Sequence, residues 1–134
     1  MRKIILILSF LLLFSCNSSK YNHVTIINNS ESSIVCFLSE KDIIEMKGVF
    51  DMHSPSEIKK NDFAFIGSDT FQGSWTRFLE NCNNKEARLY IIAKDSVDKY
   101  GWDKIYEKGI YNKKYLLTIE GLNKIDWEIT YDGK

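Results

Sequence analysis

Proline, histidine and cysteine are scarce in this sequence, and neither sign of charge is in excess. There is one proline in 134 residues, while 44% of residues are hydrophobic and 13% aromatic, so the composition is that of a folded domain and not of a disordered chain. The 18 basic and 18 acidic residues balance, which leaves no basic excess for binding nucleic acid or anionic lipid. His23 and His53 are not at ligand spacing and no Cys-x-x-Cys occurs, so we expect no metal site.

Long apolar runs are also missing, apart from one near the N-terminus. Residues 4–14 are apolar except for Ser9. As a helix, at ~1.5 Å per residue, this run would be roughly 16 Å long, about half the hydrocarbon core of a bilayer. Arg2 and Lys3 precede it. A short positive region before a short apolar run is typical of a secretory signal peptide, and we predict that residues 1–15 are removed.

The apolar run ends in Leu13-Phe14-Ser15-Cys16, with an apolar residue three positions before the cysteine and a small residue directly before it. This pattern resembles the leader of bacterial lipoproteins, although Phe14 is bulkier than the usual occupant. The resemblance implies that Cys16 receives a thioether-linked diacylglycerol and becomes the acylated first residue. Ordinary secretion, the alternative, would need small residues three and one before the cleavage site, which Leu13 and Phe14 fit poorly.

Lipidation of Cys16 would hold the chain at a membrane, because each buried CH₂ contributes ~0.8 kcal/mol and several acyl chains together anchor firmly. Residues 16–22 would be the tether, and the six residues after Cys16 reach about 20 Å when extended. No acidic run follows Cys16, and in Bacteroidota lipoproteins such runs commonly mark export to the cell surface. We therefore expect one domain, residues 23–134, anchored in the cell envelope at the periplasmic face of the outer membrane.

Hydrophobic periodicity predicts short strands with a few short helices between them. We predict strands at residues 24–28, 32–38, 88–93, 113–119 and 126–131, and an alternating segment within residues 56–66. We also predict helices at residues 75–82 and 102–108, the latter ended by Gly109. The first two strands are expected to form a hairpin, Asp95 or Ser96 to cap a further helical turn, and residues 121–124 to form a turn. Residues 39–55 fit neither period and are interpreted as an irregular connection. The fold class is mainly β, a two-layer antiparallel β-sandwich, with an α+β fold as the alternative.

Two cysteines remain once Cys16 is assigned to lipid. Cys36 lies in an apolar run and Cys82 at the end of a predicted helix. An oxidising envelope makes a disulfide between them a candidate, and it would contribute ~4 kcal/mol by closing a loop of about 46 residues. The alternative is two separate buried thiols, since free cysteine is a common core residue.

Motifs for catalysis are absent. No Gly-x-Ser-x-Gly occurs, and the glycines are scattered singly, so neither a nucleophile elbow nor a phosphate loop is present. His53 lies in the irregular stretch, where a histidine is usually a solvated loop residue. A glycan hydrolase would need a carboxylate pair, and the available acids are interpreted as surface charge: Asp95, Asp98, Asp103, Glu107, Glu120 and Asp126. We predict no enzymatic activity and no cofactor.

Aromatic residues are the candidate binding residues, because they combine a large contact area with a polar tip. The set is Tyr100, Trp102, Tyr106 and Tyr111. Trp102 and Tyr106 also fall at helical spacing with Ile105, which is more often the sign of a core-facing stripe than of a binding surface.

The C-terminal half resembles small Bacteroidota lipoproteins of uncharacterised function. The matching segments are 89–95 (LYIIAKD), 99–105 (KYGWDKI), 114–118 (KYLLT) and 122–131 (LNKIDWEITY). The resemblance carries no catalytic or binding residues. We expect a lipoprotein with a non-enzymatic binding or scaffold role, whose partners are the membrane and an envelope protein or glycan. A small envelope hydrolase and an inhibitor or immunity-type lipoprotein are the alternatives.

Overall fold

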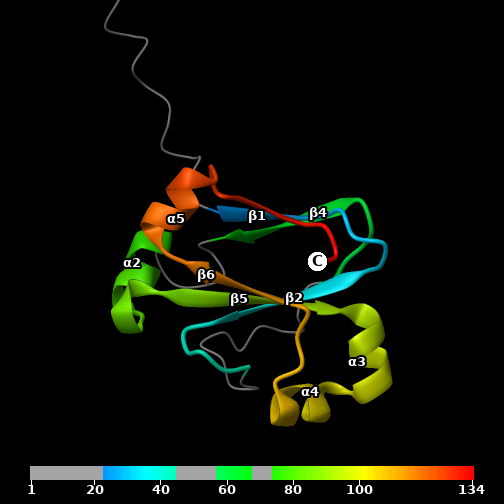
Figure 1. Ribbon diagram of the computed structural model, residues 1–134. Helices are drawn as coiled ribbons and strands as arrows, with labels where there is room; N and C mark the ends of the chain where they lie inside the picture. Colours follow the sequence, from blue (N-terminus) through cyan, green and yellow to red (C-terminus); the bar gives the residue numbers. More distant parts are fainter. Residues whose placement is uncertain (1–22, 45–56, 68–73) are drawn as a thin grey trace, which may run out of the picture.

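The fold has three tiers, two stacked β-sheets and a pair of helices (Figure 1). We describe it from a computed structural model, which describes residues 23–44, 57–67 and 74–134. The predicted signal peptide, the tether with Cys16, and His53 lie outside these residues. The elements in chain order are β1 (His23–Asn28), β2 (Ile34–Ser39), β3 (Glu57–Ile58), β4 (Asp62–Gly67), α2 (Trp75–Asn81), η3 (Asn83–Lys85), β5 (Ala87–Ala93), α3 (Lys94–Tyr100), α4 (Trp102–Lys108), β6 (Lys113–Leu117), α5 (Ile119–Lys124) and β7 (Glu128–Tyr131).

The strands form two sheets, which confirms the predicted mainly-β, sandwich-like fold. One sheet has three strands in the order β4-β1-β7, and the other has four in the order β3-β2-β5-β6. The pairs of the four-stranded sheet are antiparallel, and so is β1–β4. The β1–β7 pair is parallel, so the first and last described strands lie side by side and the sandwich is not purely antiparallel.

The predicted hairpin of residues 24–28 and 32–38 is wrong, because β1 and β2 belong to different sheets. The physical reason lies in Asn28, which ends β1 and is 0% exposed. Its side-chain amide donates to the carbonyls of Ser32 (2.9 Å) and Ile58 (3.0 Å), and its Oδ1 accepts from the backbone N–H (3.0 Å) and hydroxyl (2.6 Å) of Ser30. These bonds hold the chain in a crossing from one sheet to the other.

The main core lies between the two sheets. Alternate residues of each long strand point into it, as the period-2 patterns predict, and two helices close one end of the sandwich (Figure 1). Trp75, Phe78 and Leu79 of α2 are buried there, which confirms the predicted helical stripe. The ring of Trp75 lies 6.2 Å from that of Trp127.

Helices α3 and α4 cover the outer face of the four-stranded sheet (Figure 1). Ile105 of α4 packs with Tyr90 and Ile92 of β5 in a second, smaller cluster. Trp102 and Tyr106 pack against this cluster, so the stripe at helical spacing is a core-facing stripe. Helix α4 has the predicted bounds, and Gly109 ends it in the left-handed conformation (φ 60°, ψ 46°).

Two local predictions are wrong. Residues 121–124, expected as a turn, belong to α5, because the Thr118 hydroxyl accepts from the Gly121 N–H (3.0 Å) and so caps a helical turn that includes this glycine. Helix α3 already begins at Lys94, so Asp95 and Ser96 lie inside it and neither is its cap; the N-cap residue is Ala93, with no side-chain cap.

Candidate binding pocket

An open pocket of about 310 Å³ lies on the outer face of the four-stranded sheet, beside the C-terminal end of α4. Its polar wall comes from Asp42, in the segment after β2, from Tyr90 of β5 and from Lys114 of β6. Its aromatic wall comes from Tyr106 of α4 and from Tyr111, which follows the turn at Gly109. The volume is at the lower end of the range for small-molecule sites, about 300–1,000 Å³.

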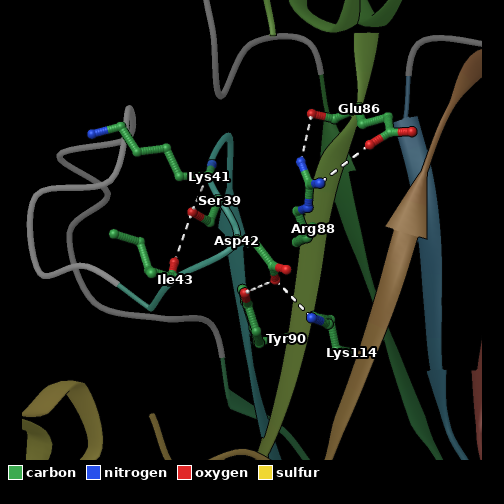
Figure 2. A network of polar contacts seen from close by, with 8 residues as sticks. All are labelled: Ser39, Lys41, Asp42, Ile43, Glu86, Arg88, Tyr90 and Lys114. Carbon is green, nitrogen blue, oxygen red and sulfur yellow. Dashed lines mark hydrogen bonds and ion pairs between the residues drawn. The ribbon is translucent and has the colours of Figure 1, made fainter. Parts of the chain in front are cut away.

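The polar wall is a connected group, shown in Figure 2. Asp42 Oδ1 accepts hydrogen bonds from the Tyr90 hydroxyl at 3.1 Å and from Lys114 Nζ at 2.6 Å. The sheet brings the two donors together, since Tyr90 pairs directly with Lys114 across β5 and β6. Adjacent strands therefore fix the spacing of the two groups that hold the carboxylate.

Ionisation of this group follows from its contacts. The hydrogen bond from Lys114 is the largest cause that lowers the pKa of Asp42 below its usual range, followed by the bond from Tyr90. The same bond raises the pKa of Lys114. Burial first, and the bond to Asp42 second, raise the pKa of Tyr90 to about 12. At neutral pH the wall consequently presents a carboxylate, an ammonium and a protonated phenol.

The segment that carries Asp42 is itself held in place. The hydroxyl of Ser39, the last residue of β2, donates to the Ile43 carbonyl (3.0 Å) and accepts from the Lys41 N–H (3.2 Å) (Figure 2). Ser39 is buried. These two bonds close a turn around Asp42, which explains how a residue outside any strand reaches the sheet face.

The aromatic wall contains two of the four predicted binding residues. Tyr111 is 44% exposed, and its ring lies 5.2 Å from that of Tyr90 at 66°. Tyr106 stacks on Trp102 at 5.5 Å and 22°, while Trp102 itself is not among the lining residues. Tyr100 is not among the lining residues, and its ring lies under Lys99 Nζ at 4.9 Å.

Sequence reasoning missed the polar wall. Alternation along β5 and β6 could have placed Tyr90 and Lys114 on outward faces. The pairing of these strands and the position of Asp42 are non-local, and no motif in the sequence signals them.

Cys36 and Cys82 are free thiols in the structure, so the candidate disulfide is not formed there. Cys82 belongs to the core between the sheets, and the partly buried Cys36 packs against that core. Burial is the main cause that raises the pKa of Cys36 to about 12 and that of Cys82 to about 11. The structure therefore has the two cysteines as separate thiols, which was the alternative to the disulfide.

Two of the acidic residues considered for catalysis form ion pairs on the surface. Asp98 pairs with Lys94, and Glu120 pairs with Lys124 at 2.6 Å, each one helical turn apart. Glu107 lines the pocket. Within the described ranges, no group of three or more His, Cys, Asp or Glu side chains could hold a metal ion.

No helix among the described residues is long and apolar enough to cross a membrane. No protein-family model matches the sequence, and comparisons with curated proteins and with solved structures found no match.

Proposed function

We propose that this chain is a lipid-anchored protein of the bacterial envelope that binds a partner without transforming it. Its pocket beside α4 is the proposed binding site. The observation that carries the site is the hydrogen-bonded group of Asp42, Tyr90 and Lys114 beside the exposed ring of Tyr111. The anchor is carried by the leader pattern that ends at Cys16.

The ionisation of the wall supports binding over catalysis. A general acid or base works best when its pKa lies near the working pH. The pKa of Asp42 is lowered and that of Tyr90 is raised to about 12, so both move away from neutrality. These groups are suited to accept and donate hydrogen bonds in a fixed state.

A glycan is the ligand class that fits this wall best. Sugar hydroxyls both donate and accept, and the wall offers a carboxylate, an ammonium and a phenol within one hydrogen-bonded group. The exposed ring of Tyr111 supplies a flat apolar surface next to them. A polar segment of an envelope protein is the competing occupant.

Photo-crosslinking in native envelopes tests both the site and the ligand class. A crosslinking amino acid replaces Tyr111 in one variant and Tyr100, an exposed tyrosine outside the pocket, in the matched control. We expect a discrete adduct from position 111 and none from position 100, with glycosidase or protease sensitivity identifying the partner. Equal patterns from the two positions would contradict the site.

Purified oligosaccharides provide a second test. Titration of the acylated protein with an N-acetylglucosamine oligomer should give binding that Tyr111→Ala and Asp42→Asn each weaken by about tenfold or more, or ~1.4 kcal/mol. Tyr100→Ala should leave it unchanged. The anchor is tested separately, since Cys16→Ala should move the protein from the membrane fraction to the soluble fraction.

A further inference from the structure

The outer face of the three-stranded sheet carries two large exposed rings. Phe63 and Phe65 of β4 are 55% and 58% exposed. Their centroids lie 5.2 Å apart, and His23 packs edge-on against Phe65 at 4.5 Å. Contiguous exposed apolar patches on a soluble domain commonly mark protein or membrane interaction sites.

The strand register shows what else shares this face. Because side chains alternate, the face is formed by His23, Thr25 and Ile27 of β1, Phe63 and Phe65 of β4, and Glu128 and Thr130 of β7. Glu128 is the one carboxylate among these described positions, and none of them is a lysine or arginine. The face is therefore apolar to weakly polar, and its described positions carry no positive charge that would attract an anionic partner.

The place of this face along the chain points to its occupant. His23 is both the first residue of β1 and a member of the face. Six residues separate it from Cys16, a stretch that reaches about 20 Å at most. An acylated Cys16 would thus hold this edge of the domain within a short distance of the lipid headgroups.

We infer that this face, which we call the Phe63–Phe65 face, lies against the lipid bilayer; the inference rests on the proposed lipidation of Cys16. Exposed phenylalanine side chains bury favourably at the boundary between the lipid headgroups and the acyl chains. The tether makes the contact intramolecular, so a small patch suffices where it would not hold a free protein. Helix α4 lies on the side of the four-stranded sheet away from the three-stranded sheet (Figure 1). The pocket is lined by residues of α4, so in this orientation it would face away from the membrane.

Depth-sensitive quenching of the full acylated protein tests the orientation. A fluorophore is attached at Thr130→Cys, an exposed position on the Phe63–Phe65 face, or at Leu116→Cys, an exposed position on the outer face of the other sheet. The protein is reconstituted in phosphatidylcholine vesicles that contain nitroxide-labelled lipid. We expect quenching to be several-fold stronger at position 130 than at position 116.

A matched pair of variants separates docking from anchoring. In the Thr130→Cys background, Phe63→Ser with Phe65→Ser should reduce quenching to the level of position 116. Leu116→Ser with Ile125→Ser, which removes two other exposed apolar side chains, should leave quenching unchanged. Adding phosphatidylglycerol should not strengthen quenching, because the face carries no basic side chain among its described positions.

The outcomes distinguish the two proposals. Equal quenching at positions 130 and 116 on protein that mass spectrometry shows to be acylated would overturn the docking and leave the anchor standing. Self-quenching at position 130 that rises with protein density and not with nitroxide lipid would overturn it in favour of contact between two copies. An unacylated Cys16 would overturn the anchor, and the docking with it.

Discussion

Replacing Asn28 should destabilise the fold more than replacing any surface polar residue nearby. Its side chain is fully buried and makes hydrogen bonds with three parts of the chain: Ser30, Ser32, and the end of β3 at Ile58 and Lys59. In Asn28→Ala, the Ser30 N–H and the Ile58 carbonyl lose this partner while buried. Each such group costs ~1–3 kcal/mol, so we expect a loss of about 4 kcal/mol in the free energy of unfolding.

Urea unfolding measures this loss, with the buried Trp75 and Trp127 as fluorescent reporters. For a slope of ~2 kcal/mol per molar, the midpoint should fall by about 2 M. Asn29→Ala is the matched control, since the neighbouring asparagine is exposed and its replacement should stay within about 0.5 kcal/mol. A midpoint for Asn28→Ala close to that of Asn29→Ala would show that the buried amide does not hold the crossing between the sheets.

A double-mutant cycle isolates the central contact. Ser30→Ala removes the hydroxyl that donates to Asn28 Oδ1 at 2.6 Å and lies 3.0 Å from the Ser32 carbonyl, and should cost ~1–2 kcal/mol. The double variant should lose less than the sum of the single losses, by about 1 kcal/mol. Strict additivity would mean that the two side chains do not interact.

Three further perturbations probe the site, the thiols and the backbone. Because the bond from Lys114 lowers the pKa of Asp42, Lys114→Met should raise the pKa of Asp42. In the unaltered protein, the ion pair should be lost as pH falls through the folded-state pKa of Asp42. Carboxyl NMR titration measures the pKa in both proteins, and an unchanged pKa would rule out the pairing. Burial raises the pKa values of Cys36 and Cys82 to about 12 and about 11. Iodoacetamide should therefore modify both thiols far more slowly in the folded protein than in urea, and equal rates would show that they are not buried. A Cβ added at Gly101 meets no atom within 4 Å, but the residue must adopt φ 73°. Gly101→Ala should therefore cost ~1–3 kcal/mol through backbone strain. Thermal unfolding measures this loss, and an unchanged stability would exclude that conformation.

Local patterns made part of the fold predictable. The stripe at Trp75, Phe78 and Leu79, and the α4 helix ended by Gly109, depend on residues within a few positions of one another. The same holds for the alternation of β7, where Ile129 and Tyr131 are buried. Each of these features follows from the hydrophobic periodicity of a single segment, so one sequence is enough to predict it.

Pairing and crossing were not predictable in the same way. Asn28 and its neighbours have the composition of a hairpin turn, yet the amide of Asn28 bonds to residue 58, far along the chain. The helical turn at Gly121 depends on the Thr118 cap, which competes with the turn preference of glycine. The pocket requires Asp42 to meet β5 and β6, and no local rule brings a loop residue to strands some 50 to 70 positions later.

The lipid anchor at Cys16 is best tested by the intact mass of this protein taken from its native host's membranes. We expect residues 1–15 to be missing and the chain to start at a Cys16 that carries thioether-linked diacylglycerol. A chain recovered from the soluble fraction with an unmodified Cys16 would contradict the anchor, the proposed envelope role and the membrane-facing orientation together.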